Sequence, residues 1–361
     1  MRKINFLAIP AILLCVLAGC RRKTDKEDYV YNVAVQEETG GEFITVGNTI
    51  TKLDDGLSVV RFDGDYGFGS FLSQGGAESD EGVIKYLASK LLSDAGDLSF
   101  GGMAFGCSTI SASNKEGGYY FGRNFDWNLC DAIIVMSYPK SGYASLSTVN
   151  LDFIKQGAGP ELLSDKTIIA ASLYAPLDGM NEKGLCVAVN MIQDSGTISQ
   201  SSAKPDITTT TAVRMLLNKA ATTDEAIELL KQYDFHASMD YMVHLAVSDS
   251  TGRSVVIEYI NNEMKVIETS VVTNFYLAEG EKNGIGTEQS HIRYGILEDA
   301  LKTNPVMDKS HVKNALSSVS KGNFGEFEST EWSIIFDQSA MEAVYYHREN
   351  YNKEFLFRLE K

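Results

Sequence analysis

The sequence predicts an α+β protein in which helices cover the faces of antiparallel sheets. After residue 107, most of the chain consists of short apolar segments separated by turn residues, as is typical of antiparallel strands. Two pairs of segments with helical spacing interrupt these strands. The chain has neither βαβ alternation nor a GxGxxG motif, so a dinucleotide-binding fold is not favoured.

The composition is that of an ordinary globular protein. The 361 residues include 44% hydrophobic and 10% aromatic residues with only 6 prolines, a length that permits one domain or two. Without residues 1–19 the chain keeps 30 Lys and Arg against 48 Asp and Glu, a net charge of −18. Because such a surface repels phosphate backbones, nucleic acid is not expected as a partner.

The N-terminus has the pattern of an export signal. Arg2 and Lys3 precede an apolar segment at 6–19, which is shorter than the roughly 20 residues that span a bilayer as a helix. The segment ends in LAGC, which resembles a bacterial lipobox with Cys20 as the lipidated residue. We therefore expect a lipoprotein signal at 1–19 and a membrane-anchored, exported protein, in preference to a plain secretory signal.

The next segments divide into a tether and a small unit. Residues 20–40 are charged and polar with weak periodicity, and we interpret them as the tether. Residues 41–106 contain strand-like pieces near 42–46 and 57–62 and a helical pattern at 80–96. They predict a small α+β unit that precedes the main chain.

The remaining elements follow in order from residue 107. A hairpin turn at NKEGG separates the first two predicted strands, and Thr222 and Glu225 have the spacing of a helix capping box. The predicted strands are 107–113, 119–125, 132–138, 143–149, 242–249, 253–260, 263–270, 271–277, 331–337, 341–347 and 354–359. The predicted helices are 209–220, 224–233, 290–301 and 310–320.

The cysteines point to a free thiol. Besides Cys15 in the predicted signal and the expected lipidation site Cys20, the chain has Cys107, Cys130 and Cys186, an odd number in an oxidising compartment. A catalytic thiol needs a base or cationic neighbours, because only the thiolate attacks a carbonyl. No histidine has the context of a papain-type enzyme, and His244 alternates with strand residues as a structural histidine would. A Cys-His enzyme stays open but is not favoured.

Cleavage before Cys107 would supply a base by another route. If the bond between Gly106 and Cys107 is cut, the new α-amine has a pKa near 8 and lies on the same residue as the thiol. The nucleophile would then carry its own base. Glycine at 106 suits an N-to-S acyl shift, because it lets the backbone adopt the strained turn that this step requires.

The segment around Cys107 resembles the choloylglycine hydrolase family of N-terminal nucleophile hydrolases. That family begins with a cysteine, and a GRNxD motif places its arginine sixteen residues later; this chain has GRNFD with Arg123 at that distance and Asp126 as its acid. Three later segments also resemble the family, at 178–190, 271–275 and 290–295. The resemblance implies a four-layer αββα sandwich.

The resemblance also implies the site residues. They are Cys107 as nucleophile, Arg123, Asp126, Asn190, Asn274 and Arg293. By residue type, Asp126 would hold the α-amine, Arg123 would stabilise the thiolate and fix the carboxylate of Asp126, and the two asparagines would donate N–H groups to an oxyanion. Arg293 would close the charge network. Taken singly, each has an ordinary structural explanation: a surface ion pair, turn asparagines and a helix-face arginine.

The chain also departs from the family pattern. Ser108 follows the nucleophile where threonine is usual, and Asn190 lies one residue nearer to NEKG than expected. In addition, 86 residues separate Cys20 from Cys107. Such a long pro-segment resembles those family members in which internal self-cleavage leaves a small and a large chain associated, here 41–106 and 107–361.

The resulting prediction is a self-processing amidase that hydrolyses a small-molecule N-acyl amide through a thioester on Cys107, without a metal or an organic cofactor. An acyltransferase using the same thioester is an alternative, and so is an unprocessed lipid-anchored binding protein on the same scaffold. A homo-oligomer is compatible with this interpretation. The sequence leaves the acyl group and the amine of the substrate open.

Overall fold

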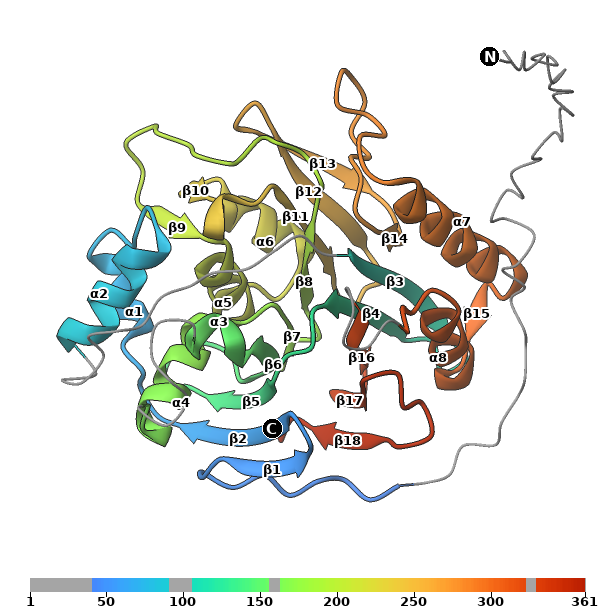
Figure 1. Ribbon diagram of the computed structural model, residues 1–361, viewed down its shortest axis with the longest axis horizontal. Coiled ribbons are helices and arrows are strands. Elements are labelled where there is room, and N and C mark those ends of the chain that lie inside the picture. The colour runs from blue at the N-terminus through green and yellow to red at the C-terminus, as the bar shows by residue number, and fades with distance from the viewer. Residues whose placement is uncertain (1–40, 91–105, 156–162, 323–328, 361) are drawn as a thin grey trace, which may run out of the picture. The chain divides into compact units, whose positions relative to one another are not determined.

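The computed structural model describes residues 41–90, 106–155, 163–322 and 329–360 (Figure 1). The predicted signal segment, Cys20, the tether and the end of the helix predicted at 80–96 lie outside these ranges. None of the helices within them combines the length and apolar character needed to cross a membrane.

Two sheets form the centre of the described chain. Nine of its strands make the first sheet, in the spatial order β1 (Thr51–Asp54), β2 (Leu57–Asp63), β5 (Ala132–Tyr138), β6 (Ser145–Asn150), β7 (Asp178–Asn181), β8 (Cys186–Met191), β11 (Val243–Ser248), β12 (Ser254–Ile260) and β13 (Glu263–Glu268). The second runs β14 (Val271–Val272), β3 (Gly106–Asn114), β4 (Tyr119–Trp127), β16 (Ser329–Asp337), β17 (Glu342–His347) and β18 (Phe355–Arg358), with β15 (Val306–Met307) beside β3.

Helices cover the outer face of each sheet. Against the first sheet lie α4 (Asp165–Tyr174), α5 (Thr209–Lys219) and α6 (Thr223–Leu230); against the second lie α7 (Glu288–Thr303) and α8 (Lys309–Ser318). Three apolar clusters fill the spaces: one between the first sheet and its helices, one between the two sheets, and one under α7 and α8. The predicted four-layer αββα sandwich is confirmed.

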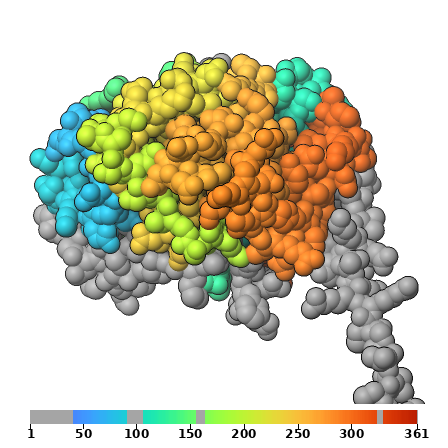
Figure 2. All heavy atoms as spheres, turned by 90° about the horizontal axis from the view of Figure 1, so that it is seen from above, coloured from blue at the N-terminus to red at the C-terminus, as the bar shows by residue number. Residues whose placement is uncertain are grey.

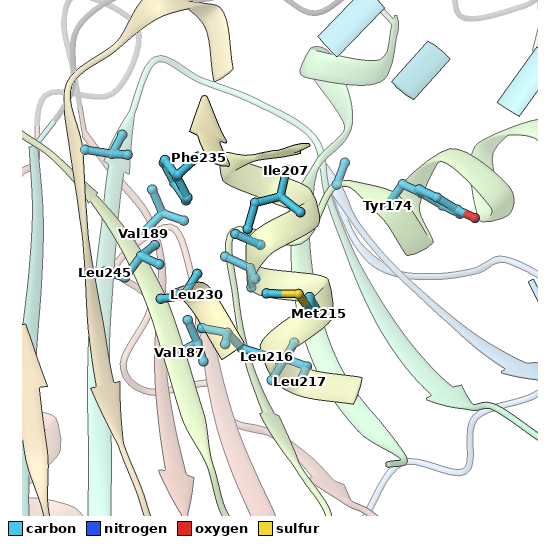
Figure 3. Close-up of a cluster of buried hydrophobic side chains, with 14 of the residues drawn as sticks. Tyr174, Val187, Val189, Ile207, Met215, Leu216, Leu217, Leu230, Phe235 and Leu245 are labelled. Atoms are coloured by element: carbon cyan, nitrogen blue, oxygen red, sulfur yellow. The ribbon is translucent and has the colours of Figure 1, made fainter. Parts of the chain in front are cut away.

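The first of these clusters shows why the helices lie where they do. Figure 3 shows Leu216 on α5 beside the strand residue Val187, with Met215 and Leu217 on other sides of the same helix; all four are buried. Three of the expected helices, α6, α7 and α8, follow a capping residue; Thr222, for example, accepts a hydrogen bond from the Glu225 amide at 3.2 Å. Helix α4 was not expected, because apolar residues on all sides hide its periodicity.

Residues 41–90 are built into the same layers. Strand β2 pairs in parallel with β5, while α1 (Phe68–Ser73) and α2 (Asp80–Lys90) pack on the first apolar cluster. The strand expected near 42–46 is reduced to a single bridge between Phe43 and Leu356, because this segment runs along the edge of the second sheet. Residues 41–90 therefore share their core with the strands that follow Cys107. The division of the protein into a small chain ending at residue 106 and a large chain starting at Cys107 stays a prediction.

The aromatic core of this segment gives a stability prediction. Replacing Phe71 with alanine should lower the free energy of unfolding by about 3–5 kcal/mol, because its buried ring packs on Phe68, Tyr86 and Tyr174. The matched control is Phe43→Ala, which removes a partly exposed ring and should lower it by about 1 kcal/mol or less. Urea unfolding, with Cys107→Ala in every variant to block the proposed cleavage, measures both; equal losses would contradict this packing.

Candidate active site around Cys107

The β3–β4 hairpin brings three of the predicted residues together. In its register Gly106 lies opposite Asp126, Cys107 opposite Phe125, and Thr109 opposite Arg123. The turn is closed by Asn114, whose side-chain oxygen accepts hydrogen bonds from the amides of residues 116 and 118. A local hairpin therefore explains how residues sixteen to nineteen positions after the cysteine return to it.

Each polar atom of Cys107 contacts a different predicted side chain. Its backbone N–H donates to Asn274 Oδ1 at 2.7 Å, and its carbonyl accepts from Arg293 Nη1 at 2.6 Å. Its thiol lies 3.6 Å from Arg123 Nη2. All of these groups are buried, so the hydrogen bonds act in a low-dielectric environment where they are strong. The amide, the carbonyl and the sulfur of Cys107 are thus each contacted by a different side chain.

The orientation of the Asn274 amide follows from its neighbours. Its oxygen accepts from Cys107 and, at 2.7 Å, from Arg293 Nη2, while its Nδ2 donates to the Met191 carbonyl at 2.6 Å. The opposite orientation would place N–H groups against two donors, so the network selects this one. Asn274 therefore presents an acceptor to the Cys107 nitrogen, a contact that the expected oxyanion role does not include.

A buried His–Glu pair holds the segment that carries Asn274. His244 Nδ1 lies 3.1 Å from Glu258 Oε1, and its Nε2 lies 2.7 Å from the Thr273 carbonyl. Glu258 also accepts from the backbone amides of Leu277 and Ala278. Burial by itself would raise the pKa of Glu258, but the hydrogen bonds from His244 and these amides lower it overall. His244 is a buried sheet residue, as expected from the sequence. It holds the segment at Thr273, and its partner Glu258 holds the same segment at Leu277 and Ala278.

Arg123 is paired with a carboxylate that differs from the expected one. Its Nη1 lies 2.7 Å from Asp178 Oδ2, and its guanidinium also donates to the carbonyls of Leu177 and Val189. The expected partner, Asp126, lies elsewhere because Arg123 points between the two sheets toward β7. Trp332 Nε1 donates to the same Asp178 oxygen at 2.9 Å. The buried charge of Arg123 is thereby balanced while one Nη still faces the thiol.

Asp126 lies on the other side of the Gly106–Cys107 bond. Thr330 donates to its Oδ1 at 2.7 Å, and Arg293 and Lys321 lie 3.8 and 3.9 Å from its Oδ2. A Cβ at position 106 would come within 2.5 Å of Lys321 Nζ and 2.9 Å of Asp126 Oδ2. Gly106 is the first residue of β3, and a Cβ there would press on the ends of the Lys321 and Asp126 side chains; the strained turn expected for the acyl shift stays a prediction.

Asn190 is the predicted residue that stays apart from this network. On β8 it pairs with His244 across the sheet, and its Nδ2 lies 3.5 Å from the Val272 carbonyl. Among the described residues it forms no hydrogen bond with Cys107, and its buried Oδ1 has no partner. Its role as an oxyanion donor stays a prediction.

The thiol is buried and held in its neutral form. Burial raises the pKa of Cys107, and the positive charge of Arg123 opposes this shift only in part. An intact peptide bond at residue 107 leaves the thiol without an adjacent amine base. The uncleaved chain is therefore poorly suited to forming a thiolate.

A narrow apolar cavity of about 40 Å³ lies directly beside Cys107. Its walls are mostly aromatic and aliphatic, including Phe125, Trp127, Phe153, Leu177, Met239 and Tyr241. Thr209, Thr210 and Ser238 also border it. The cavity suits an apolar group bound next to the sulfur.

The described residues contain no group of three or more His, Cys, Asp or Glu side chains placed to hold a metal ion.

Several site residues have no distinct signal in the sequence. Lys321 and Thr330 follow Cys107 by more than 200 residues, and only the pairing of β4 with β16 brings them to Asp126. Asp178 is the first residue of the segment that ends at Asn190. An acidic residue next to an apolar strand could have indicated a buried ion pair. The partner of that pair still depends on the packing of the two sheets.

Two solved structures have the same fold as this chain. A mutant of the conjugated bile acid hydrolase from Clostridium perfringens is similar in structure, with a TM-score of 0.52 and 21% identity over 70% of this chain and 92% of that one. Another variant of that enzyme gives a TM-score of 0.51 at 18% identity, with the same coverage. The fold is that of the N-terminal nucleophile hydrolases.

Part of the chain also matches a protein family. Residues 107–275 match the model of the linear amide C-N hydrolases, choloylglycine hydrolase family. A penicillin V acylase from Pectobacterium atrosepticum is 31% identical over 99 residues, which cover 25% of this chain and 26% of that protein. The aligned part is thus about a quarter of the length of that relative.

The Arg123–Asp178 pair gives a prediction for stability. Arg123→Met or Asp178→Asn should each lower the free energy of unfolding by about 3–5 kcal/mol, because each leaves its partner charge or acceptors buried and unbalanced. The double variant should lose about 1–3 kcal/mol less than the sum.

The exposed Arg61–Asp63 pair is the matched control for this cycle. Its atoms approach to 2.9 Å in solvent, so Arg61→Met with Asp63→Asn should couple by about 1 kcal/mol or less. Urea unfolding in the Cys107→Ala background measures both cycles. Strict additivity at Arg123 and Asp178 would contradict a buried pair.

Proposed function

We propose that this protein is a self-processing cysteine amidase that hydrolyses a linear N-acyl amide through a thioester on Cys107. The observation that carries the proposal is the separate support of the amide, carbonyl and sulfur of Cys107 by Asn274, Arg293 and Arg123. A cysteine buried only for packing has no need of three such contacts. The match of residues 107–275 to the model of the amide hydrolase family supports the same proposal.

The first reaction is cleavage of the chain. The Cys107 sulfur attacks the Gly106 carbonyl carbon, the Gly106–Cys107 C–N bond breaks, and the thiol proton passes to the departing nitrogen. Water then hydrolyses this thioester, leaving a carboxylate on Gly106 and a free thiol and amine on Cys107. Lys321, whose ammonium packs against Gly106, is placed to balance the new carboxylate.

The processed residue then acts on the substrate. The neutral α-amine accepts the thiol proton, the thiolate attacks the amide carbonyl, and the α-ammonium gives that proton to the leaving nitrogen as the C–N bond breaks. Asn274 Oδ1 and the nearby carboxylate of Asp126 hold the α-amine. Asn190 and the second N–H of Asn274 are the proposed donors to the oxyanion. Water releases the acid from the thioester.

The pieces produced by cleavage are expected to stay together. Strand β2 lies beside β5 within the first sheet, and buried residues of 41–90 belong to the same apolar cluster as α5. Separation would expose this core to water. The chain ending at Gly106 is therefore proposed as a permanent part of the enzyme.

The substrate acyl group is proposed to be apolar. The cavity beside the Cys107 sulfur is bordered by rings and aliphatic side chains, and it offers few polar partners. An acyl chain that enters it loses contact with water and gains contact with these walls. The relatives include a penicillin V acylase and a conjugated bile acid hydrolase, and the present chain is proposed to share their amide chemistry.

Export and lipid attachment at Cys20 are proposed from the sequence alone. The basic start, the apolar segment at 6–19 and the LAGC ending are the support for this step. Mass measurement on protein from membranes should then find a chain that begins at Cys20 and carries acyl groups.

Self-cleavage predicts two chains in the purified protein. Intact mass should show one chain ending at Gly106 and another starting at Cys107, whereas Cys107→Ala should yield the uncut chain and lose all amide hydrolysis. Cys130→Ala is the matched control, since Cys130 is also a buried free thiol but lies outside the site. A Cys107→Ala protein that still matures into two pieces would exclude self-cleavage.

The apolar cavity predicts the order of substrates. In a series of N-acyl 4-nitroanilides from acetyl to octanoyl, kcat/KM should rise about fourfold per added methylene until the cavity is filled, since each buried methylene is worth about 0.8 kcal/mol. The succinyl analogue, with a charged acyl end, should be the poorest substrate. A preference for that analogue, or the same rate along the series, would argue against an apolar acyl site.

A further inference from the structure

One wall of the cavity beside Cys107 has a strained backbone. The short 3-10 helix η2 (Ser238–Asp240) and the following Tyr241 border the cavity. Within it Met239 and Asp240 have φ angles of 55° and 57°, a left-handed conformation that non-glycine residues rarely adopt. Such a conformation persists only where surrounding contacts hold it.

The contacts that hold it come from Asp80, at the start of α2. Ser238 Oγ donates to Asp80 Oδ1 at 2.8 Å, and the Met239 amide donates to Asp80 Oδ2 at 2.9 Å. Asp80 is buried, and burial raises its pKa, with these two hydrogen bonds acting in the opposite direction. Both carboxylate oxygens are therefore committed to the two residues that form the strained wall.

A second contact fixes the same region. The amide of Ala77 donates to the Asp206 carbonyl at 3.2 Å, and the Asp206 amide donates to the Gly75 carbonyl at 2.8 Å. Gly76 has a φ of +71°, and a Cβ there would lie 1.9 Å from the Asp206 carbonyl oxygen, so the two segments touch through backbone alone. Figure 2 shows the cyan residues of this segment beside the yellow-green ones.

Asp206 is close in the sequence to another part of the cavity wall. Asp206 begins β9 (Asp206–Thr208), which is followed by the cavity residues Thr209 and Thr210 on α5. Thr209 Oγ1 also accepts a hydrogen bond from the Ser238 amide at 2.9 Å. Residues 75–80 thus brace two adjoining pieces of the wall, although they lie N-terminal to Cys107 and outside the cavity.

We propose that Asp80 is a specificity-determining positioning residue, through which the chain released N-terminal to Cys107 sets the shape of the acyl cavity. The inference rests on the proposed amidase function and extends it. The small chain then has a role after cleavage, because its Asp80 carboxylate holds the Ser238 hydroxyl and the Met239 amide in the wall.

The test compares Asp80→Asn with Glu81→Gln, the same type of change at the adjacent exposed residue. The asparagine keeps the shape but replaces one acceptor oxygen with an N–H group, so one of the two bonds is lost. The ratio of kcat/KM for octanoyl over butyryl anilide should change by about tenfold in Asp80→Asn, with KM moving more than kcat. Glu81→Gln should leave the ratio unchanged, and both proteins should still be cut before Cys107.

A second measurement does not depend on hydrolysis. In the Cys107→Ala background, hydrogen exchange of a peptide covering 236–242 should become faster with Asp80→Asn and stay unchanged with Glu81→Gln. Ser238→Ala removes one of the same bonds from the other side, and it should accelerate exchange as well if Asp80→Asn fails to fold. Unchanged exchange in these variants, or an unchanged acyl ratio in an active Asp80→Asn enzyme, would overturn the proposal. A wild-type protein that hydrolyses no amide would instead refute the proposed function, and the exchange data would still decide whether Asp80 holds the wall.

Discussion

The buried pair of Arg123 and Asp178 is the constraint on which the site depends. Arg123 lies on β4 of one sheet and Asp178 on β7 of the other, and their atoms approach to 2.7 Å with no exposure to solvent. A guanidinium can be buried there because a carboxylate and two carbonyls accept hydrogen bonds from it. The pair therefore fixes the distance between the two sheets next to Cys107, where Arg123 Nη2 lies close to the sulfur.

Around this pair, three different side chains contact the sulfur, the nitrogen and the carbonyl of Cys107. Arg123 supplies positive charge to the sulfur, Asn274 holds the nitrogen, and Arg293 holds the carbonyl. In the uncut chain, burial keeps the thiol neutral, and the proposed cleavage changes one thing near it: an amide becomes an amine. The proposed cysteine nucleophile would then need no histidine base, because the reaction that matures the protein would produce the base.

Local features of this site could be predicted from the sequence, and non-local ones could not. The hairpin turn and the spacing of Arg123 and Asp126 place both near Cys107, because register in a two-stranded hairpin is set by its turn. The pairing of Arg123 with Asp178 depends on how two sheets pack, which no local pattern contains. The close approach of Lys321 Nζ to Gly106 likewise joins residues more than 200 positions apart. The layers were predictable from alternating strands and paired helices, while the joining of β2 to β5 required the structure.

The central claim is that Cys107 carries a free amine and a free thiol in the mature protein. Labelling with 2-cyanobenzothiazole, which condenses only with a residue that has both groups, tests it most directly. Digestion and mass spectrometry should place the label on a peptide that begins at Cys107, and labelling should abolish amide hydrolysis. A purified, active protein that takes up no label at Cys107 would contradict the account.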